Sequence, residues 1–245
     1  MFIASKSMEK LNNKNILIIG ATGGIGQQLA AMLVQSGAHV FLAARNKTKL
    51  DEIGAKLQVS PQQLFQADLG DEGSIKSLGE AIHSQVSHID ILINASGIGI
   101  IKPVEQLNIE EFQRSIQVNL TGPFLLIKTF LPAMKKAGKG LIINIPGVLG
   151  KVPMAGAAAY CASKYGLVGM MQSIREELKR TEIRITNIYL GGVDSPFWDS
   201  IDLRVQKDKM IRAEEAARAI WFLCQQPVSG VVSEMVLQPF NHQAI

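Results

Sequence analysis

Tyr160 and Lys164, four residues apart in the sequence, are side chains of the kinds that can take part in proton transfer. In a helix this spacing places both side chains on one face, one turn apart, so the ammonium group can lie close to the phenol. A free tyrosine has a pKa of about 10, and a nearby positive charge favours the phenolate. The pair could therefore exchange a proton with an alcohol or a carbonyl. The same spacing also occurs on many solvated helices, so the rest of the chain must decide between the two interpretations.

Length and composition indicate one domain of the α/β class. A chain of 245 residues with 47% hydrophobic residues can bury a large core. The net charge of +4 comes from scattered basic residues, which favours a solvated surface with one local phosphate site over a nucleic-acid partner. No stretch approaches about eighteen uninterrupted apolar residues, so no membrane span is predicted. Residues 1–13 are expected to form a flexible tail, and residues 14–245 a single domain.

The cysteines and histidines predict neither a disulfide framework nor a metal site. Cys161 and Cys224 lack the CxxC spacing, so the reducing cytoplasm is the expected location. The four histidines share no metal-ligand spacing with each other or with the cysteines. We therefore expect no bound metal.

A glycine-rich turn near the start of the chain could bind a ligand beside the tyrosine and lysine. It follows an apolar run at 15–19 and precedes a segment with helical periodicity. Glycine permits positive φ and close backbone approach, and the N–H groups that begin the helix face a phosphate. A plain glycine turn is the alternative. The turn contains Gly20, Thr22, Gly24, Ile25 and Gly26.

The end of the second predicted strand, residues 39–44, indicates which dinucleotide the turn would bind. A dinucleotide fold places an acidic residue here to hold the ribose 2′-hydroxyl of NAD. This chain has Arg45 instead, with Lys47 and Lys49 close behind, which suits the 2′-phosphate of NADP. The alternative is a basic start of a surface helix running to about Gln58, which the helix macrodipole disfavours.

Strands and helices alternate along the rest of the chain. This pattern predicts a single doubly wound domain of the Rossmann type, with a mostly parallel seven-stranded sheet and helices on both faces. Ligands bind beyond the carboxyl ends of such strands. Further strands are expected at 64–68, 89–93, 140–145, 184–189 and 234–238, and helices at 73–84, 108–134, 213–224 and around Tyr160 to about Arg180.

Polar and small residues follow these strand ends. Asp68 could reach the adenine or cap its loop, and Asn94 to Gly97 could let the cofactor lie close or form a bare turn. Pro146 and Gly147 favour a type II turn. Residues 194–211 are irregular, which is typical of a lid over an apolar site, although an ordinary surface loop is the alternative.

These motifs resemble those of the short-chain dehydrogenase/reductase family over nearly the whole chain, with only the N-terminal tail outside. The glycine turn resembles TGxxxGxG, with Ile19 where threonine is usual, and Asn94-Ala-Ser-Gly97 resembles a diverged NNAG. Residues 190–195 resemble PGxVxT, with leucine in place of proline. Asn119 matches the active-site asparagine, and the tyrosine and lysine match YxxxK.

The resemblance implies NADP as the cofactor, with NADPH preferred over NADH, and a role for each matching residue. Tyr160 would be the acid or base toward the substrate oxygen. Lys164 would lower the tyrosine pKa and hold the nicotinamide ribose, and Asn119 would position a water that links the lysine to solvent. Gly191, Val193 and Ser195 would lie beside the nicotinamide. The residues expected at the substrate end are Gly147, Met154, Phe197 and Trp198.

The fourth catalytic residue of the family, a serine, is missing. Aligning residues 142–145 with the family's IVNISS segment places Gly147 at the catalytic serine, and no Ser or Thr occurs between Thr129 and Ser163. In one interpretation the protein is still a reductase, whose substrate oxygen is held by Tyr160, a water, a backbone N–H near Gly147 or a substrate group. In another it binds NADP without turnover, as a sensor or interaction partner. In a third interpretation, Lys164 and Asn119 are present only because they support ribose binding and helix packing.

Retention of the proton-transfer groups favours the reductase. We therefore predict an NADP-dependent enzyme that reduces a small or medium apolar ketone or aldehyde, or oxidises the alcohol. A minor alternative is a 3-ketoacyl group on an acidic carrier protein, which a basic cluster near the lid would suit, although a solvated loop explains that cluster equally well. The cluster consists of Arg204, Lys207, Lys209 and Arg212. The resemblance also implies a homodimer or homotetramer, formed through the two long helices.

Overall fold

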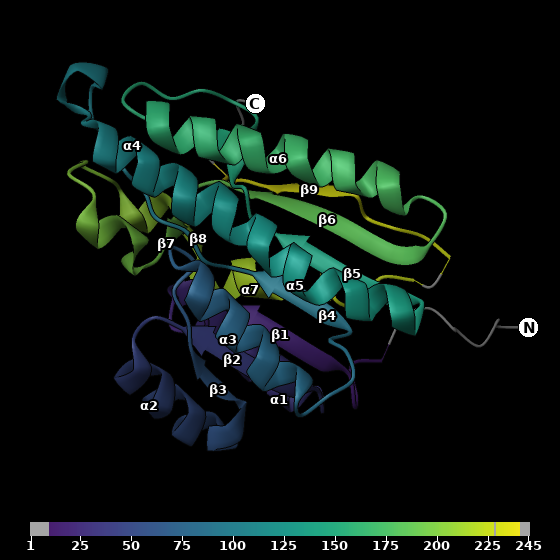
Figure 1. Cartoon of the computed structure of the whole chain (residues 1–245). Helices are drawn as coiled ribbons and strands as arrows, with labels where there is room; N and C mark the ends of the chain where they lie inside the picture. Colours follow the sequence, from purple (N-terminus) through teal and green to yellow (C-terminus); the bar gives the residue numbers. More distant parts are fainter. Residues whose placement is uncertain (1–9, 228, 241–245) are drawn as a thin grey trace, which may run out of the picture.

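Seven parallel strands form the central sheet of the computed structural model, which describes residues 10–227 and 229–240 (Figure 1). Their order across the sheet is β3-β2-β1-β4-β5-β6-β9. The strands are β1 Asn15–Ile19, β2 His39–Ala44, β3 Leu64–Gln66, β4 Ile91–Asn94, β5 Lys139–Asn144, β6 Glu182–Leu190 and β9 Glu234–Leu237. A separate short pair joins β7 Val193–Asp194 to β8 Ile211–Arg212.

Helices cover both faces of the sheet, as the apolar runs of the strands require. Successive side chains of β1 point to opposite faces, so Ile16 and Ile18 pack with α1 and α7, whereas Leu17 and Ile19 pack with α3, α5 and α6. Figure 1 shows this second set of helices in front of the sheet. The helices are α1 Gly24–Gln35, α2 Lys47–Leu57, α3 Glu72–His83, α4 Ile109–Ile116, α5 Gly122–Ala137, α6 Ala158–Leu178 and α7 Ala213–Leu223.

The predicted fold class is confirmed, including the seven parallel strands. The strand order reverses between β1 and β4, which creates the crevice where sheets of this kind bind ligands. Among the described residues, none of the helices is both long and apolar enough to cross a bilayer.

The long helix expected at 108–134 begins as predicted and then changes its winding. Asn108 Oδ1 accepts a hydrogen bond from Glu111 N at 2.8 Å, and the Glu111 carboxylate accepts one from Asn108 N at 3.2 Å, which completes a capping box. A π-helical turn at Gln117–Thr121 separates α4 from α5. Such turns frequently occur at functional sites, and Asn119 lies within this one.

Two residues of the tail predicted at 1–13 contact the folded part of the chain. Leu11 is 4% exposed and belongs to the core cluster that contains α1. Asn13 N donates a hydrogen bond to Gly37 O at 3.0 Å. Both residues therefore belong to the domain, and residues 1–9 lie outside the described part.

Candidate active site

A cavity of about 1170 Å³ opens at the carboxyl ends of the central strands, where the sequence places the site. Three predicted site residues, Gly26, Asn94 and Asn119, are not among its lining residues. The other predicted residues all line it: Gly20, Thr22, Gly24, Ile25, Arg45, Asp68, Gly97, Gly147, Met154, Tyr160, Lys164, Gly191, Val193, Ser195, Phe197 and Trp198.

The glycine turn after β1 leaves the start of α1 open toward the cavity. Gly20 has a φ of +85°, and a Cβ there would stand 2.8 Å from the Ala95 backbone. A Cβ on Gly26 would overlap Gly20 O, so Gly26 serves the packing of the turn. The first turn of α1 has no side-chain cap and no acidic residue. These features fit a phosphate-bearing dinucleotide, because backbone N–H groups and the helix dipole both favour an anion.

The turn after β2 presents Arg45 to the cavity, whereas its two lysines do not line it. Asn46 caps α2 by accepting a hydrogen bond from Lys49 N at 2.9 Å. Lys47 pairs with Asp51 one helical turn further on. Arg45 is therefore the residue of this turn that is suited to hold a 2′-phosphate.

Asp68 caps its loop, which is one of the two roles that the sequence left open, and it also lines the cavity. Its Oδ1 accepts a hydrogen bond from Gly70 N at 2.8 Å, and its Oδ2 lies 3.5 Å from Arg114 Nη2. The loop after β3 is thereby held at the cavity edge.

Asn94 and Asn119 shape the wall of the cavity from behind. Asn94 Oδ1 accepts a hydrogen bond from Ser96 Oγ at 2.8 Å. Asn119 is 1% exposed, and its side chain pairs with both Ile98 N and Ile98 O at 2.9 Å. A Cβ on Gly97 would stand 3.4 Å from Lys164 Nζ. The π-helical turn thus positions the segment that passes directly over the lysine.

Tyr160 and Lys164 share one face of α6 and meet the cavity together. Lys164 Nζ lies 5.5 Å from the centroid of the Tyr160 ring and donates a hydrogen bond to Ile145 O at 3.1 Å. Burial lowers the pKa of Lys164 to about 8. Burial, with a smaller contribution from Cys161, raises the pKa of Tyr160 above its ordinary value. The tyrosine pKa of the polypeptide alone is therefore raised and not lowered as expected, with burial as the largest cause.

Gly147 adopts a backbone conformation that essentially only glycine tolerates. Its φ is +72° and its ψ is 170°, directly before the 3₁₀ turn Val148–Gly150. The positive φ suits the predicted type II turn, but that turn needs a ψ near 0°. The turn prediction is therefore wrong. A serine at position 147 would be strained for the same reason.

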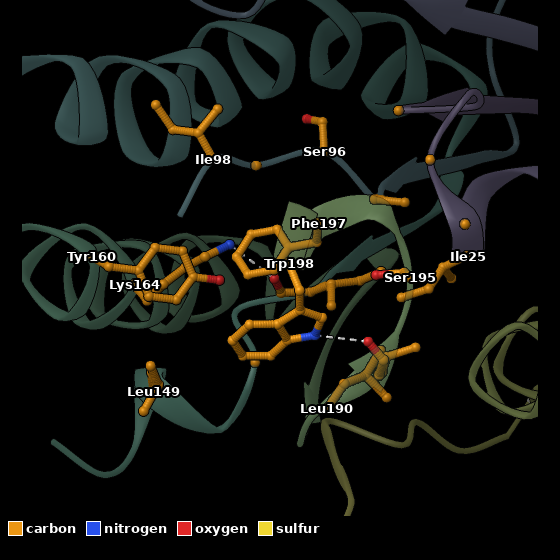
Figure 2. A pocket seen from close by; sticks show the side chains of 18 of the residues that line it. Ile25, Ser96, Ile98, Leu149, Tyr160, Lys164, Leu190, Ser195, Phe197 and Trp198 are labelled. Carbon is orange, nitrogen blue, oxygen red and sulfur yellow. Dashed lines mark hydrogen bonds between the residues drawn. The ribbon is translucent and has the colours of Figure 1, made fainter. Parts of the chain in front are cut away.

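Two aromatic side chains from the segment after β7 cover the apolar end of the cavity (Figure 2). Trp198 Nε1 donates a hydrogen bond to Val193 O at 2.9 Å. The Phe197 ring centroid lies 5.3 Å from that of Trp198 and 6.0 Å from that of Tyr160. Phe197 therefore packs against Tyr160, and Trp198 packs against Phe197.

Several lining residues were missed by the sequence analysis, although they flank the predicted motifs along the chain. Ser96 lies inside the Asn94 to Gly97 motif, and most of the others follow strand ends or precede α6. Proximity to those motifs was the signal that could have identified them. Among the apolar ones are Ile98, Ile101, Leu149, Val152, Pro153 and Met210. Over residues 10–227 and 229–240, no group of three or more His, Cys, Asp or Glu side chains could hold a metal ion.

Comparisons with known proteins agree with this geometry. A model of the short chain dehydrogenase family matches residues 14–206. An uncharacterized oxidoreductase of Staphylococcus epidermidis is 32% identical over 232 residues, covering 95% of this chain and 100% of the relative.

Two solved structures share the fold along almost their whole length. A metagenomic short-chain oxidoreductase in complex with NADP is 30% identical with a TM-score of 0.80, covering 94% of this chain and 99% of its own. A 3-ketoacyl-(acyl-carrier-protein) reductase from Brucella melitensis complexed with NADH is 25% identical with a TM-score of 0.81, covering 94% and 98%. The chain therefore belongs to the short-chain dehydrogenase family of oxidoreductases.

Proposed function

We propose that this oxidoreductase uses NADP to reduce a small or medium apolar ketone or aldehyde, or to oxidise the corresponding alcohol. One observation carries the proposal: Tyr160 and Lys164 face a single cavity that joins the glycine turn to an apolar end. A proton-transfer group between a nucleotide site and an apolar pocket is what carbonyl reduction requires.

The preference for NADPH over NADH rests on Arg45. Its guanidinium follows β2, where NAD-binding folds carry an acidic side chain, and Arg forms bidentate hydrogen bonds with phosphate. The metagenomic relative is described in complex with NADP, and the Brucella reductase with NADH. A bound nicotinamide would supply or accept the hydride.

The proton chemistry belongs to the side chains of α6. A raised pKa keeps Tyr160 protonated at neutral pH, which suits a group that donates a proton to a carbonyl oxygen. The Lys164 ammonium, nearby on the same face, would stabilise the phenolate that remains. The substrate oxygen would be held by Tyr160 together with a water or a backbone N–H near Gly147. Losing one oxyanion donor typically costs about a hundred- to a thousandfold in rate, which slows such an enzyme without abolishing turnover.

The substrate class follows from the lining of the cavity. Its charged lining residues are Arg45, Asp68 and Lys164, and the first two follow β2 and β3, on the nucleotide side. Leu149, Met154 and the two lid aromatics surround the other end. An apolar carbonyl compound therefore fits better than a substrate with its own carboxylate or phosphate.

The acidic-carrier alternative loses support from the basic cluster near the lid. Lys207 Nζ lies 2.8 Å from Asp199 Oδ1, and Arg212 forms two hydrogen bonds with the Glu215 carboxylate. These ion pairs reduce the positive charge that an acidic partner would meet.

The proposal extends to a cytoplasmic homodimer or homotetramer. Exposed aromatic side chains gather on α4, α5 and α6, which supports an interface through these helices. They are Phe112, Phe124 and Tyr165.

Replacing Tyr160 with phenylalanine tests the proposal. In Tyr160→Phe, NADPH oxidation with a responsive carbonyl compound should fall below about 1% of the wild-type rate, because the proton donor is lost. The dissociation constant for NADPH, from a fluorescence titration, should stay within about threefold. Tyr165→Phe, at a 44% exposed position of the same helix, is the matched control and should behave as wild type.

Equal rates for wild type and Tyr160→Phe would overturn the catalytic assignment. Tight NADPH binding by the wild type without turnover across a panel of apolar ketones and aldehydes would instead favour the sensor or interaction role.

A further inference from the structure

The loop of residues 147–154 forms one wall of the substrate end of the cavity. Two of its residues, Gly147 and Gly150, have no side chain. Its backbone bonds are internal: Gly150 N donates to Gly147 O at 3.0 Å, and Lys151 N donates to Val148 O at 2.9 Å. These bonds define the shape of the loop. They do not by themselves define where the loop stands relative to the sheet.

Lys151, in the middle of this wall, does not line the cavity and reaches two strands instead. Its Nζ lies 2.6 Å from Glu234 Oε2 on β9 and 4.3 Å from the centroid of the Tyr189 ring on β6. The Tyr189 hydroxyl donates a hydrogen bond to Glu234 Oε1 at 3.1 Å. Each of the three side chains therefore contacts the other two, across 83 residues of sequence.

The three side chains are sheltered enough for these contacts to hold the loop. Tyr189 is fully buried, and the side chains of Lys151 and Glu234 are 33% and 28% exposed. The hydrogen bond from Lys151 lowers the pKa of Glu234, and burial together with Glu234 raises the pKa of Tyr189 to about 12. The carboxylate therefore stays charged and the phenol stays protonated at neutral pH.

The same contacts join the two sides of the cavity. Leu190 and Gly191, directly after Tyr189, line the cavity, and so do Leu149 and Val152, within two residues of Lys151. Leu190 O lies 3.4 Å from the point where a Cβ on Gly147 would stand. A shift of the loop away from β6 and β9 would therefore change the spacing between the two walls.

We propose that Lys151, Glu234 and Tyr189 form a positioning cluster that holds the loop of residues 147–154 at the distance from β6 at which a carbonyl substrate meets Tyr160. The inference rests on the proposed function. At Gly147 only the backbone can contact the substrate, so the position of the loop determines that contact. Small displacements at a reacting centre can reduce rates greatly.

Lys151→Met tests the cluster, because it removes the charge and keeps much of the side-chain volume. We expect the KM for the carbonyl substrate to rise about 10-fold while the dissociation constant for NADPH stays within about twofold. Lys151→Arg keeps the charge and should restore a KM near that of the wild type. Glu234→Gln removes the charge from the other side and should reproduce the effect of Lys151→Met, which provides a second variant if the first does not fold.

The matched control is Lys179→Met, which breaks an ion pair with Glu176 at 3.3 Å on the exposed surface of α6. Its KM should be unchanged. A lower melting temperature for Lys151→Met with unchanged KM would show a purely structural ion pair and would overturn the proposal.

Hydrogen exchange separates this inference from the proposed reaction. In Lys151→Met the amides of residues 147–154 should exchange about 10-fold faster than in wild type, whereas Lys179→Met should leave them unchanged. If the wild type turns over none of the carbonyl compounds, the proposed function fails and the exchange rates alone decide on the cluster. Unchanged exchange in Lys151→Met and Glu234→Gln would overturn it.

Discussion

Gly147, which the sequence analysis aligned with the catalytic serine of the family, shows at the scale of one residue how backbone conformation restricts the side chain. The φ of +72° and ψ of 170° belong to a region that a residue with a Cβ occupies only with strain. The loop therefore has a geometry that suits glycine, and a serine at position 147 would disturb the wall that the loop forms.

Gly147→Ser is expected to lower the free energy of unfolding by about 1–3 kcal/mol, because the new Cβ is strained at this φ and ψ. Turnover should not exceed that of the wild type. Urea unfolding and steady-state rates with a responsive substrate measure the two effects.

Gly147→Ala is the matched control, since it carries the same backbone strain without the hydroxyl. The two variants should lose similar stability. A serine variant faster than both the alanine variant and the wild type would show that position 147 lacks only a donor, contrary to this expectation.

At the scale of elements, residues of the turn between β2 and α2 cap the helix and face the cavity. Asn46 lines the cavity but uses its side-chain oxygen to cap the helix, and Lys47 pairs with Asp51. Arg45 stands at the strand end and lines the cavity.

Arg45→Ala should weaken NADPH binding about 10- to 100-fold, because charge-assisted hydrogen bonds to the 2′-phosphate would be lost. NADH binding should change less than about threefold, since NADH lacks that phosphate. Parallel fluorescence titrations measure both affinities. Lys49→Ala, which removes a cation that does not line the cavity, should leave both nearly unchanged, and an equal loss for NADPH and NADH in Arg45→Ala would contradict the assignment.

At the scale of the whole molecule, Lys164 costs stability for the sake of the site. It is 3% exposed, and its folded-state pKa of about 8 lies below the ordinary value of 10.5. Between these two values the unfolded chain binds more protons than the folded protein, so the free energy of unfolding rises with pH through this window. Below about pH 8 both states carry the charge, and the folded protein bears the full cost of burying it.

Lys164→Met should therefore raise the free energy of unfolding at pH 7 by about 1–3 kcal/mol. The loss of the hydrogen bond from Lys164 to Ile145 O reduces this gain. The gain should shrink as the pH rises from about 8 toward 10.5. Urea unfolding of nucleotide-free protein across this range measures it, with Lys179→Met as the exposed control. A destabilised Lys164→Met at pH 7 would mean that the hydrogen bond to Ile145 outweighs the burial of the charge.

Much of the fold followed from local patterns. Buried parallel strands read as continuous apolar runs, and Asn108 with Glu111 marked a helix start, because both signals depend on neighbouring residues. The prediction of the fold class, which rests on such local signals, is confirmed. The burial of Leu11, inside the tail predicted at residues 1–13, depends on a distant core, which charges mixed into the N-terminal segment do not reveal.

The sequence by itself determined the four-residue spacing of Tyr160 and Lys164, the glycine turn, and Arg45 at a strand end, since spacing and strand ends are local properties. Only the tertiary structure decided that Asn119 pairs with Ile98, that Lys151 meets Glu234, and which ψ Gly147 adopts. It also decided the proton affinity of the central pair. A pKa depends on how much water the surrounding fold excludes, so the tyrosine whose pKa the sequence predicted to be lowered holds its proton more tightly in the folded chain.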